Sequence, residues 1–368
     1  AEFVPGTVAA GVFTKSKIPA AAVNWCREIL PTKEVRGLVV NSGNANAFTG
    51  QAGIEAVDII SRKAAEIIKC PVDQIFVAQT GVIGERLPVE KITNILSRLH
   101  RKLGDGWEEA ATTICTTDTY PKGATRTAEI NGKSIKIGGI AKGSGMIAPN
   151  MATMLAFIFT DAAILKSEFQ KLILKTTDKT FNSITVDSDT STNDSVIAFA
   201  TGLAGNKNNY SIDAKEMASF CDAFERVMRD LAHQIVRDGE GASKFVEIKI
   251  SGAESNASAK AIGLKIANSP LVKTAIAGED ANWGRIIMAV GKTSERINVD
   301  KLALNIGGVQ IAQSGTVIPG YDERPVAAHM KGQEILIKVD VGVGVGLATV
   351  WTCDLTHEYI SINADYRS

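Results

Sequence analysis

Short apolar runs alternate with longer segments of helical periodicity in the first part of the chain. Residues 36–40 and 74–78 are short, largely apolar runs that predict buried strands. Between them, the apolar residues of 54–68 recur at mostly helical spacing and predict a helix. A longer helix is predicted over 217–235, where apolar residues follow in steps of one, three and four. We expect it to end near Asp238-Gly239, because glycine is favoured just past a helix C-terminus.

Two alternating runs, 125–130 and 133–137, flank the dipeptide Asn131-Gly132. Asn-Gly is typical of a type I′ turn, in which both central residues need positive φ. The arrangement therefore predicts a β-hairpin.

The segment 334–355 also alternates and predicts β-structure. Gly342, Gly344 and Gly346 recur within it at period two, so one face of such a strand would be bare backbone open to close packing. With the other elements, this predicts a mixed α/β protein in which sheets carry helices.

Composition and charge exclude several classes of protein. The chain has 368 residues, a length that favours two or three folding units. Lys plus Arg number 40 and so do Asp plus Glu, and this balance argues against a broad nucleic-acid surface. No apolar run reaches the roughly 18 residues that a membrane-spanning helix needs.

Cysteine and histidine are too scattered to predict a metal site. No pair of cysteines has CxxC spacing, and the four histidines form no HxxxH or HExxH motif. We therefore expect no metal, and we expect the cysteines to be buried thiols in a reducing compartment. The cysteines are Cys26, Cys70, Cys115, Cys221 and Cys353.

Residues 143–148 match the loose dinucleotide-binding pattern GxGxxA. Pro149 and Asn150 follow directly, where that motif requires a helix, and no convincing acidic residue lies about 20 positions further on. Nucleotide binding is therefore a weak interpretation.

The segment 141–161 allows two interpretations. A glycine-rich polar loop runs into Ala152 and Thr153, and the apolar run 154–159 follows. The plain interpretation is a loop that leads into a buried strand. The alternative is a self-cleaving bond, in which the Thr153 hydroxyl attacks the preceding carbonyl. Cleavage would leave Thr153 with a free α-amine, whose ordinary pKa of about 8 suits a base for its own hydroxyl.

Residues 142–155 resemble the cleavage segment of the ornithine acetyltransferase family, also called bifunctional glutamate N-acetyltransferase. Further segments resemble the same family in the same order, along almost the whole chain. They are residues 39–47, 79–84, 116–119, 185–194, 278–285 and 362–367. The family usually has a further stretch before the segment that matches 8–14, so we expect the opening to be shortened or partly vector-derived.

The resemblance implies an α+β layered sandwich of the ornithine acetyltransferase/aminopeptidase-like fold. It implies self-cleavage into an N-terminal piece, 1–152, and a C-terminal piece, 153–368, that stay interlocked. The implied reaction moves an acetyl group from N2-acetylornithine to glutamate in arginine biosynthesis, by a ping-pong mechanism through acetyl-Thr153. The resemblance implies no cofactor and leaves acetyl-CoA open as a second donor. We expect a heterotetramer with two copies of each piece, in the cytoplasm, or in the mitochondrial matrix if the source is fungal, without nucleic-acid or membrane partners.

The family's functional residues carry over to matching positions. Thr153 is the expected nucleophile, with cleavage between Ala152 and Thr153, and Thr80 and Gly81 resemble the pair that stabilises the oxyanion. A hydroxyl and a backbone N–H in one loop can both donate to one oxygen. The expected substrate-binding residues are Thr116 (or its neighbour Thr117), Lys142, Thr153, Glu240, Asn363 and Ser368, the last where the family usually has threonine.

Charge fits two of these roles. The Lys142 cation can hold a substrate carboxylate or favour a neutral Thr153 amine, and the Glu240 carboxylate suits the ammonium group of an amino acid. Both can also be ordinary solvated side chains.

Other functions remain open at this point. The chain can be a related N-terminal-nucleophile amidohydrolase or aminopeptidase, with water as acceptor, or an acetyltransferase of secondary metabolism. It can also be a non-catalytic or nucleotide-binding protein that never cleaves. The state of the Ala152–Thr153 bond distinguishes the last class from the others.

Overall fold

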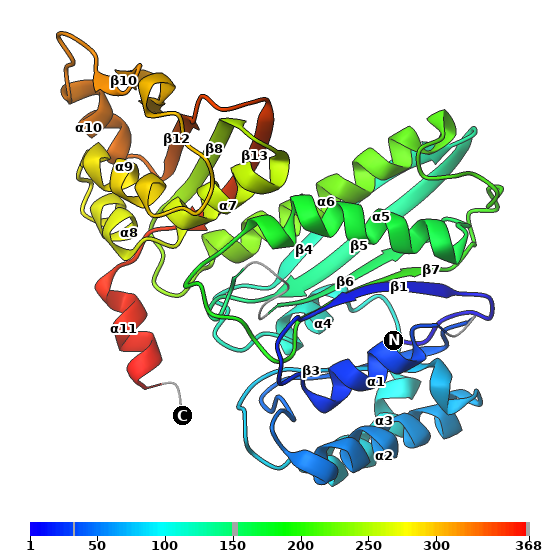
Figure 1. Ribbon diagram of the computed structural model, residues 1–368. Coiled ribbons are helices and arrows are strands. Elements are labelled where there is room, and N and C mark those ends of the chain that lie inside the picture. Colours follow the sequence, from blue (N-terminus) through cyan, green and yellow to red (C-terminus); the bar gives the residue numbers. More distant parts are fainter. Residues whose placement is uncertain (32–33, 149–153, 366–368) are drawn as a thin grey trace. The chain divides into compact units, whose positions relative to one another are not determined.

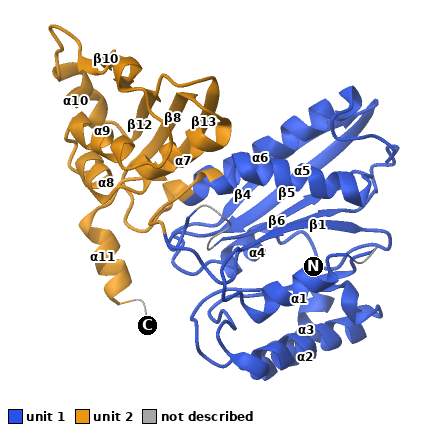
Figure 2. Cartoon of the chain, in the orientation of Figure 1, with its two compact units in different colours: residues 1–182, 189–235 blue, residues 183–188, 236–368 orange. Residues whose placement is uncertain are grey.

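The computed structural model describes residues 1–31, 34–148 and 154–365. These residues form two compact units (Figure 2). Unit 1 comprises residues 1–182 and 189–235, and unit 2 comprises residues 183–188 and 236–368.

Unit 1 is built on a five-stranded sheet with the order β1-β7-β6-β5-β4. The pair β6·β7 is parallel, and the other neighbours are antiparallel. The helices α5 and α6 run along this sheet (Figure 1). The strands are β1 (Val8–Phe13), β4 (Lys122–Ile130), β5 (Lys133–Lys142), β6 (Leu155–Thr160) and β7 (Ser195–Ala200), and the helices are α5 (Lys166–Lys179) and α6 (Ala218–Arg237).

A smaller layer packs beneath the five-stranded sheet. Its centre is the parallel pair β2 (Gly37–Asn41) and β3 (Ile75–Gln79), with helices α1 (Ala21–Ile29), α2 (Gly50–Ile68), α3 (Val89–Arg101) and α4 (Trp107–Thr113). Strand β3 contributes side chains to two apolar cores, because successive side chains of a strand point to opposite faces. Phe76 and Ala78 face the sheet strands β1, β6 and β7, whereas Ile75 and Val77 face α2.

The local expectations for unit 1 are confirmed. The strands β2 and β3, the helix α2 and the strand β6 lie within a few residues of their predicted places. The hairpin is also confirmed, since Asn131 and Gly132 join β4 to β5 with φ of 48° and 77°. Helix α6 ends at Arg237, directly before Asp238-Gly239.

The buried strand β6 explains the continuous apolar run after residue 153. It lies between β5 and β7, with Leu155 paired to Lys142 on one side and to Ser195 on the other. A strand that is covered on both faces has no solvent side, so its sequence loses the alternation of a surface strand.

Unit 2 is a six-stranded sheet with the order β11-β10-β9-β12-β8-β13 and its own apolar core. Its helices are α7 (Asn256–Ala267), α8 (Pro270–Ala277), α9 (Trp283–Gly291), α10 (Arg324–Met330) and α11 (His357–Ala364). Its strands are β8 (Phe245–Ala253), β9 (Ala303–Ile306), β10 (Val309–Gln313), β11 (Thr316–Val317), β12 (Glu334–Asp340) and β13 (Gly346–Cys353). The expected mixed α/β class is confirmed.

The expectation of one glycine-faced strand over 334–355 is wrong in part. The segment forms two strands, β12 and β13, which flank β8 from opposite sides. Gly342 and Gly344 lie in the connection between them, and Gly342 has a φ of 65°. The expected close approach does occur, because a Cβ on Gly346 would lie 2.3 Å from the backbone of Ser255. These glycines thus allow the backbone between β12 and β13 to turn and to pack closely against neighbouring backbone.

Candidate active site

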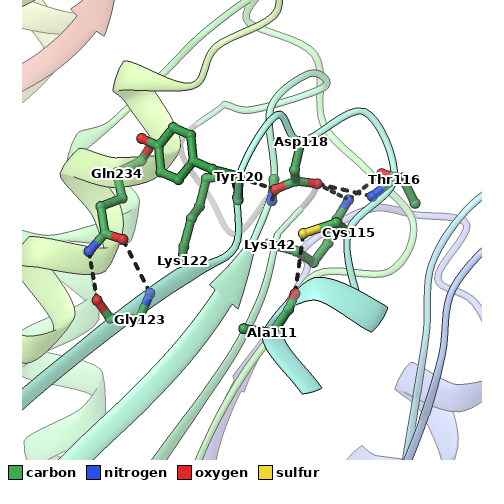
Figure 3. A network of polar contacts seen from close by, with 10 residues as sticks. Ala111, Cys115, Thr116, Asp118, Tyr120, Lys122, Gly123, Lys142 and Gln234 are labelled. Atoms are coloured by element: carbon green, nitrogen blue, oxygen red, sulfur yellow. Dashed lines mark hydrogen bonds and ion pairs between the residues drawn. The ribbon is translucent and has the colours of Figure 1, made fainter. Parts of the chain in front are cut away.

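A buried carboxylate holds two lysines at one end of the β4–β5 hairpin (Figure 3). The Asp118 side chain is fully buried, and its Oδ1 accepts hydrogen bonds from Lys122 Nζ and from the Gly143 N–H, both at 2.6 Å. Lys122 is itself fully buried. Asp118 and Lys122 are four residues apart across the turn into β4, so the chain needs little extra ordering to pair them.

Lys142 ends β5 and belongs to the same cluster. Its Nζ donates a hydrogen bond to Thr116 Oγ1 at 2.8 Å and lies 3.8 Å from Asp118 Oδ2. The Thr116 N–H in turn donates to Asp118 Oδ2 at 3.1 Å. Of the two neighbouring threonines, Thr116 is therefore the one that Lys142 binds.

Burial and charge act on this cluster in opposite directions. Burial lowers the pKa of Lys142 below its ordinary value, against the effect of the Asp118 carboxylate, which raises it. Burial alone would raise the pKa of Asp118, but the positive charges of Lys142 and Lys122 and the Gly143 N–H together hold it below its ordinary value. Asp118 is thus the negative charge that keeps an ammonium group in a nearly dry site.

Thr80 and Gly81 form a tight turn directly after β3. The Thr80 N–H donates to the Asn41 carbonyl at 3.1 Å, and Gly81 has a φ of +130°. A Cβ on Gly81 would lie 2.2 Å from the carbonyl carbon of Gly43, so this position requires glycine. Neither the Thr80 hydroxyl nor the Gly81 N–H has a hydrogen-bond acceptor among the described residues. Both groups are therefore available as donors.

The two residues before β7 connect this turn to the start of β6. Asn193 Nδ2 donates to the carbonyls of Ala45, at 2.7 Å, and of Gln79, at 2.8 Å. Its neighbour Asp194 accepts the Met154 N–H on Oδ1 at 2.6 Å. The Thr80–Gly81 turn and the first residue after Thr153 are therefore fixed by adjacent side chains.

Unit 2 contains a second pair of candidate residues. Glu240 is buried in the loop after α6, and its Oε2 accepts a hydrogen bond from Asn363 Nδ2 at 2.7 Å. Thr356 Oγ1 also donates to the Gly241 carbonyl at 2.7 Å, so both ends of α11 are attached to this loop. Gly241 has a φ of 69°, and a Cβ there would lie 2.6 Å from the backbone nitrogen of Tyr359. The flanking glycine thus permits the close approach of α11.

Comparisons with known proteins identify the family. The family model described as the ArgJ family matches residues 3–368. The chain belongs to the ArgJ family. It is 55% identical over 369 residues to the arginine biosynthesis bifunctional protein ArgJ of Gluconobacter oxydans, a match that spans 100% of this chain and 87% of that protein. It is 53% identical to the protein of the same name from Zymomonas mobilis, over 100% of this chain and 90% of that protein.

A solved structure agrees with this assignment. The crystal structure of arginine biosynthesis bifunctional protein ArgJ from Bacillus halodurans is 40% identical, with a TM-score of 0.54, and the match covers 55% of this chain and 95% of that chain. The family resemblance inferred from the motifs is confirmed, and so is the expected enzyme class, an acetyltransferase of arginine biosynthesis. The roles of individual residues and self-cleavage stay predictions.

The predicted site residues that the structure describes are divided between the two units. Thr80, Gly81, Thr116 and Lys142 lie in unit 1, and Glu240 and Asn363 lie together in unit 2. The predicted cleavage residues Ala152 and Thr153, and the predicted contact Ser368, lie outside the described residues.

Sequence reasoning missed the side chains that hold the site in place. Asp118, Asn193 and Asp194 all fall within segments that carry the family resemblance, but nothing in their spacing showed what they contact. The one local signal was the pairing of Asp118 with Lys122 at a distance of four residues. In the described part of the chain, no three His, Cys, Asp or Glu side chains are grouped as a metal site would require. No helix there is long and apolar enough to cross a membrane.

Proposed function

We propose that this ArgJ-family enzyme transfers an acetyl group from N2-acetylornithine to glutamate by a ping-pong reaction through an acetyl-Thr153 ester. The Thr153 hydroxyl attacks the acetyl carbonyl, ornithine leaves, and the amine of glutamate then attacks the ester. The enzyme uses no cofactor in this scheme.

One observation supports the proposal: within unit 1, Lys142 and the side chains of Asn193 and Asp194 connect the start of β6 with candidate groups for this chemistry. Lys142 is paired with Leu155, two residues after Thr153, and Asp194 binds the N–H of Met154. Asn193 attaches the Thr80–Gly81 turn to the same end of the sheet. The two residues that follow position 153 in the chain are therefore connected to a strand that ends in a buried cation and, through Asp194 and its neighbour Asn193, to a turn with two available donors.

Each group has a role that its chemistry suits. The Thr80 hydroxyl and the Gly81 N–H stabilise the oxyanion of the tetrahedral intermediate. Lys142, held by Thr116, binds a substrate carboxylate. Glu240 and Asn363 bind the amino-acid end of the substrate, with Ser368 as a further contact.

Thr153 becomes N-terminal when the chain cleaves itself at Ala152–Thr153, and the sheet keeps the two pieces together. Strands β1, β4 and β5 belong to the piece 1–152, whereas β6 and β7 belong to the piece 153–368. In the sheet order, β7 and β6 of the second piece lie between β1 and β5 of the first, since β1 pairs with β7 and β5 pairs with β6. The break leaves these pairings intact, so we propose that the two pieces remain associated. We also propose that two copies of each piece form a heterotetramer.

The test combines mass measurement with an acetyl-transfer assay. The purified protein is expected to give two masses under denaturing conditions, 1–152 and 153–368, with Thr153 as a new N-terminus. With labelled N2-acetylornithine alone, the label is expected on the 153–368 piece, and added glutamate is expected to remove it as N-acetylglutamate. Thr153→Ala is expected to give a single uncleaved chain without labelling.

Two outcomes would contradict the proposal. Release of free acetate at the same rate with or without glutamate would identify a hydrolase instead. Transfer by an uncleaved chain would show that Thr153 is not an N-terminal nucleophile. Labelled acetyl-CoA in place of N2-acetylornithine tests the second donor in the same assay.

A further inference from the structure

Asp194 is a buried carboxyl group that the proposed mechanism does not yet use. Its side chain is completely buried, and only Oδ1 has a partner, the Met154 N–H at 2.6 Å. Oδ2 is inaccessible to solvent and has no hydrogen-bond partner in the described part of the chain. A buried polar atom without a partner destabilises the fold, so its presence calls for an explanation such as a functional role.

The position of Asp194 suggests what that purpose is. Met154, whose N–H donates to Asp194, directly follows Thr153 in the chain. Self-cleavage breaks the peptide bond at the Thr153 nitrogen, so Asp194 is bound to the residue next to the reacting one. We propose that Asp194 is the proton-transfer residue for the Thr153 nitrogen: it donates a proton to that nitrogen during self-cleavage and accepts one from it in the mature enzyme. This inference rests on the proposed self-cleavage at Ala152–Thr153.

The proton balance of the first step is simple. The Thr153 oxygen forms a bond to the Ala152 carbonyl carbon, and the bond from that carbon to the Thr153 nitrogen breaks. The nitrogen already carries one hydrogen, and it receives the hydroxyl proton and the Asp194 proton. The products are an ester, an α-ammonium group and an Asp194 carboxylate, and water then hydrolyses the ester.

The mature enzyme uses the reverse transfer. The α-ammonium group of Thr153 returns a proton to the Asp194 carboxylate and becomes a neutral amine. That amine then accepts the Thr153 hydroxyl proton when the hydroxyl attacks the acetyl donor. A single carboxyl group can therefore serve both stages without any histidine.

The surroundings of Asp194 favour the protonated acid. Burial raises its pKa well above the ordinary value, while the Met154 N–H and the positive charge of Lys142 lower it. Lys142 is the charged group that acts on Asp194 from β5, and behind it lie Asp118, Lys122 and Cys115. From the end of β1, Thr14 contributes only its backbone N–H, which donates to the Asp194 carbonyl at 3.0 Å.

The experiment follows the first appearance of the two pieces in full-length chains. Wild type, Asp194→Asn and Asp161→Asn are made by cell-free translation, synthesis is stopped, and samples are shifted to buffers from acidic to alkaline pH. Asparagine keeps an oxygen for the Met154 N–H but cannot transfer a proton. Asp161 is the matched control, because it follows the other end of β6 and its Oδ1 likewise accepts a backbone N–H, from Lys136 at 2.8 Å.

We expect Asp194→Asn to slow cleavage about 100-fold or more, the usual contribution of a positioned acid or base, and Asp161→Asn to cleave at the wild-type rate. The wild-type rate is expected to fall as pH rises through the raised pKa of Asp194, and the residual rate of Asp194→Asn is expected to lack this dependence. Asp194→Glu, which restores a carboxyl group, is expected to recover part of the rate together with a pH dependence.

Cleavage of Asp194→Asn at the wild-type rate would overturn the inference, since only the Met154 contact would then matter. If Asp194→Asn does not fold, the wild-type profile decides, because a cleavage rate that rises steadily with pH excludes an acid at this step. Failure of the wild-type chain to cleave at any pH would instead overturn the proposed function.

Discussion

The sharpest test of the site's electrostatics is the substitution Asp118→Asn. It removes the negative charge from a fully buried carboxyl group that lies 2.6 Å from Lys122 and 3.8 Å from Lys142, and it leaves the side-chain shape unchanged. Removing one partner of a buried ion pair typically costs about 3–5 kcal/mol, because the remaining charge stays buried without compensation. We expect a loss of unfolding free energy of this size.

The chain offers a matched control. Asp58 pairs with Arg62 at 2.8 Å and with the same four-residue spacing as Asp118 and Lys122, but both side chains of this pair are exposed. Water screens such a pair, and the charged side chains are well solvated without it. We therefore expect Asp58→Asn to have a far smaller effect than Asp118→Asn.

The pH dependence of the loss separates electrostatics from packing. In the folded protein the pKa of Lys142 is below its ordinary value, so between those two values the unfolded chain binds more protons and stability rises with pH. Without the Asp118 charge the pKa of Lys142 falls further, and this rise begins at lower pH. The difference in unfolding free energy between wild type and Asp118→Asn should therefore become smaller as pH becomes alkaline. At acidic pH it should also narrow, as Asp118, whose pKa is lowered in the fold, becomes protonated.

Equilibrium unfolding in urea measures these differences, and a Thr153→Ala background keeps every variant a single chain. Equal losses for Asp118→Asn and Asp58→Asn would refute the reasoning. A large loss for Asp118→Asn that stays constant from neutral to alkaline pH would also refute it, because the loss would then come from altered packing.

Three further predictions concern the proposed site. Thr80→Val should lower kcat by about 100-fold to 1000-fold with little change in KM, and an unchanged kcat in steady-state kinetics would remove Thr80 from the oxyanion site. Gly81→Ala should lower both activity and thermal stability, because its Cβ would lie 2.2 Å from a backbone carbon, whereas Gly84→Ala, with no atom within 4 Å, should lose less in the same melting assay. Asn363→Ala should raise KM for the amino-acid substrate more than it lowers kcat, because Glu240 loses its amide partner, and an unchanged KM would contradict that role.

Local signals were sufficient to predict most single elements. Asn131-Gly132 predicted the β4–β5 turn because few dipeptides tolerate two consecutive positive φ angles. The apolar stripe of α6 and the glycine after it predicted both the face and the end of that helix. These features depend on residues close in the chain, so neighbouring sequence carries the information.

The tail shows where local pattern is insufficient. Alternation over 334–355 correctly indicated β-structure, but β12 and β13 lie on opposite sides of β8. Which strand lies next to which is set by packing between distant segments, and glycines at period two do not distinguish a bare strand face from a tight connection. The break at Gly342 was therefore not visible in the pattern.

The candidate site was predictable as a set of residues but not as an arrangement. Thr116 and Lys142 came from motifs, whereas the contact of Asn193 with Ala45 joins residues 148 positions apart. That contact exists because the sheet places β7 beside β6, and β3 beneath them, so that the segments before and after these strands meet at one end. The same sheet order pairs Lys142 directly with Leu155, although twelve residues lie between them in the chain. A bond broken in that connection would leave both of its flanking strands paired, so the fold itself makes cleavage at this position compatible with an intact site.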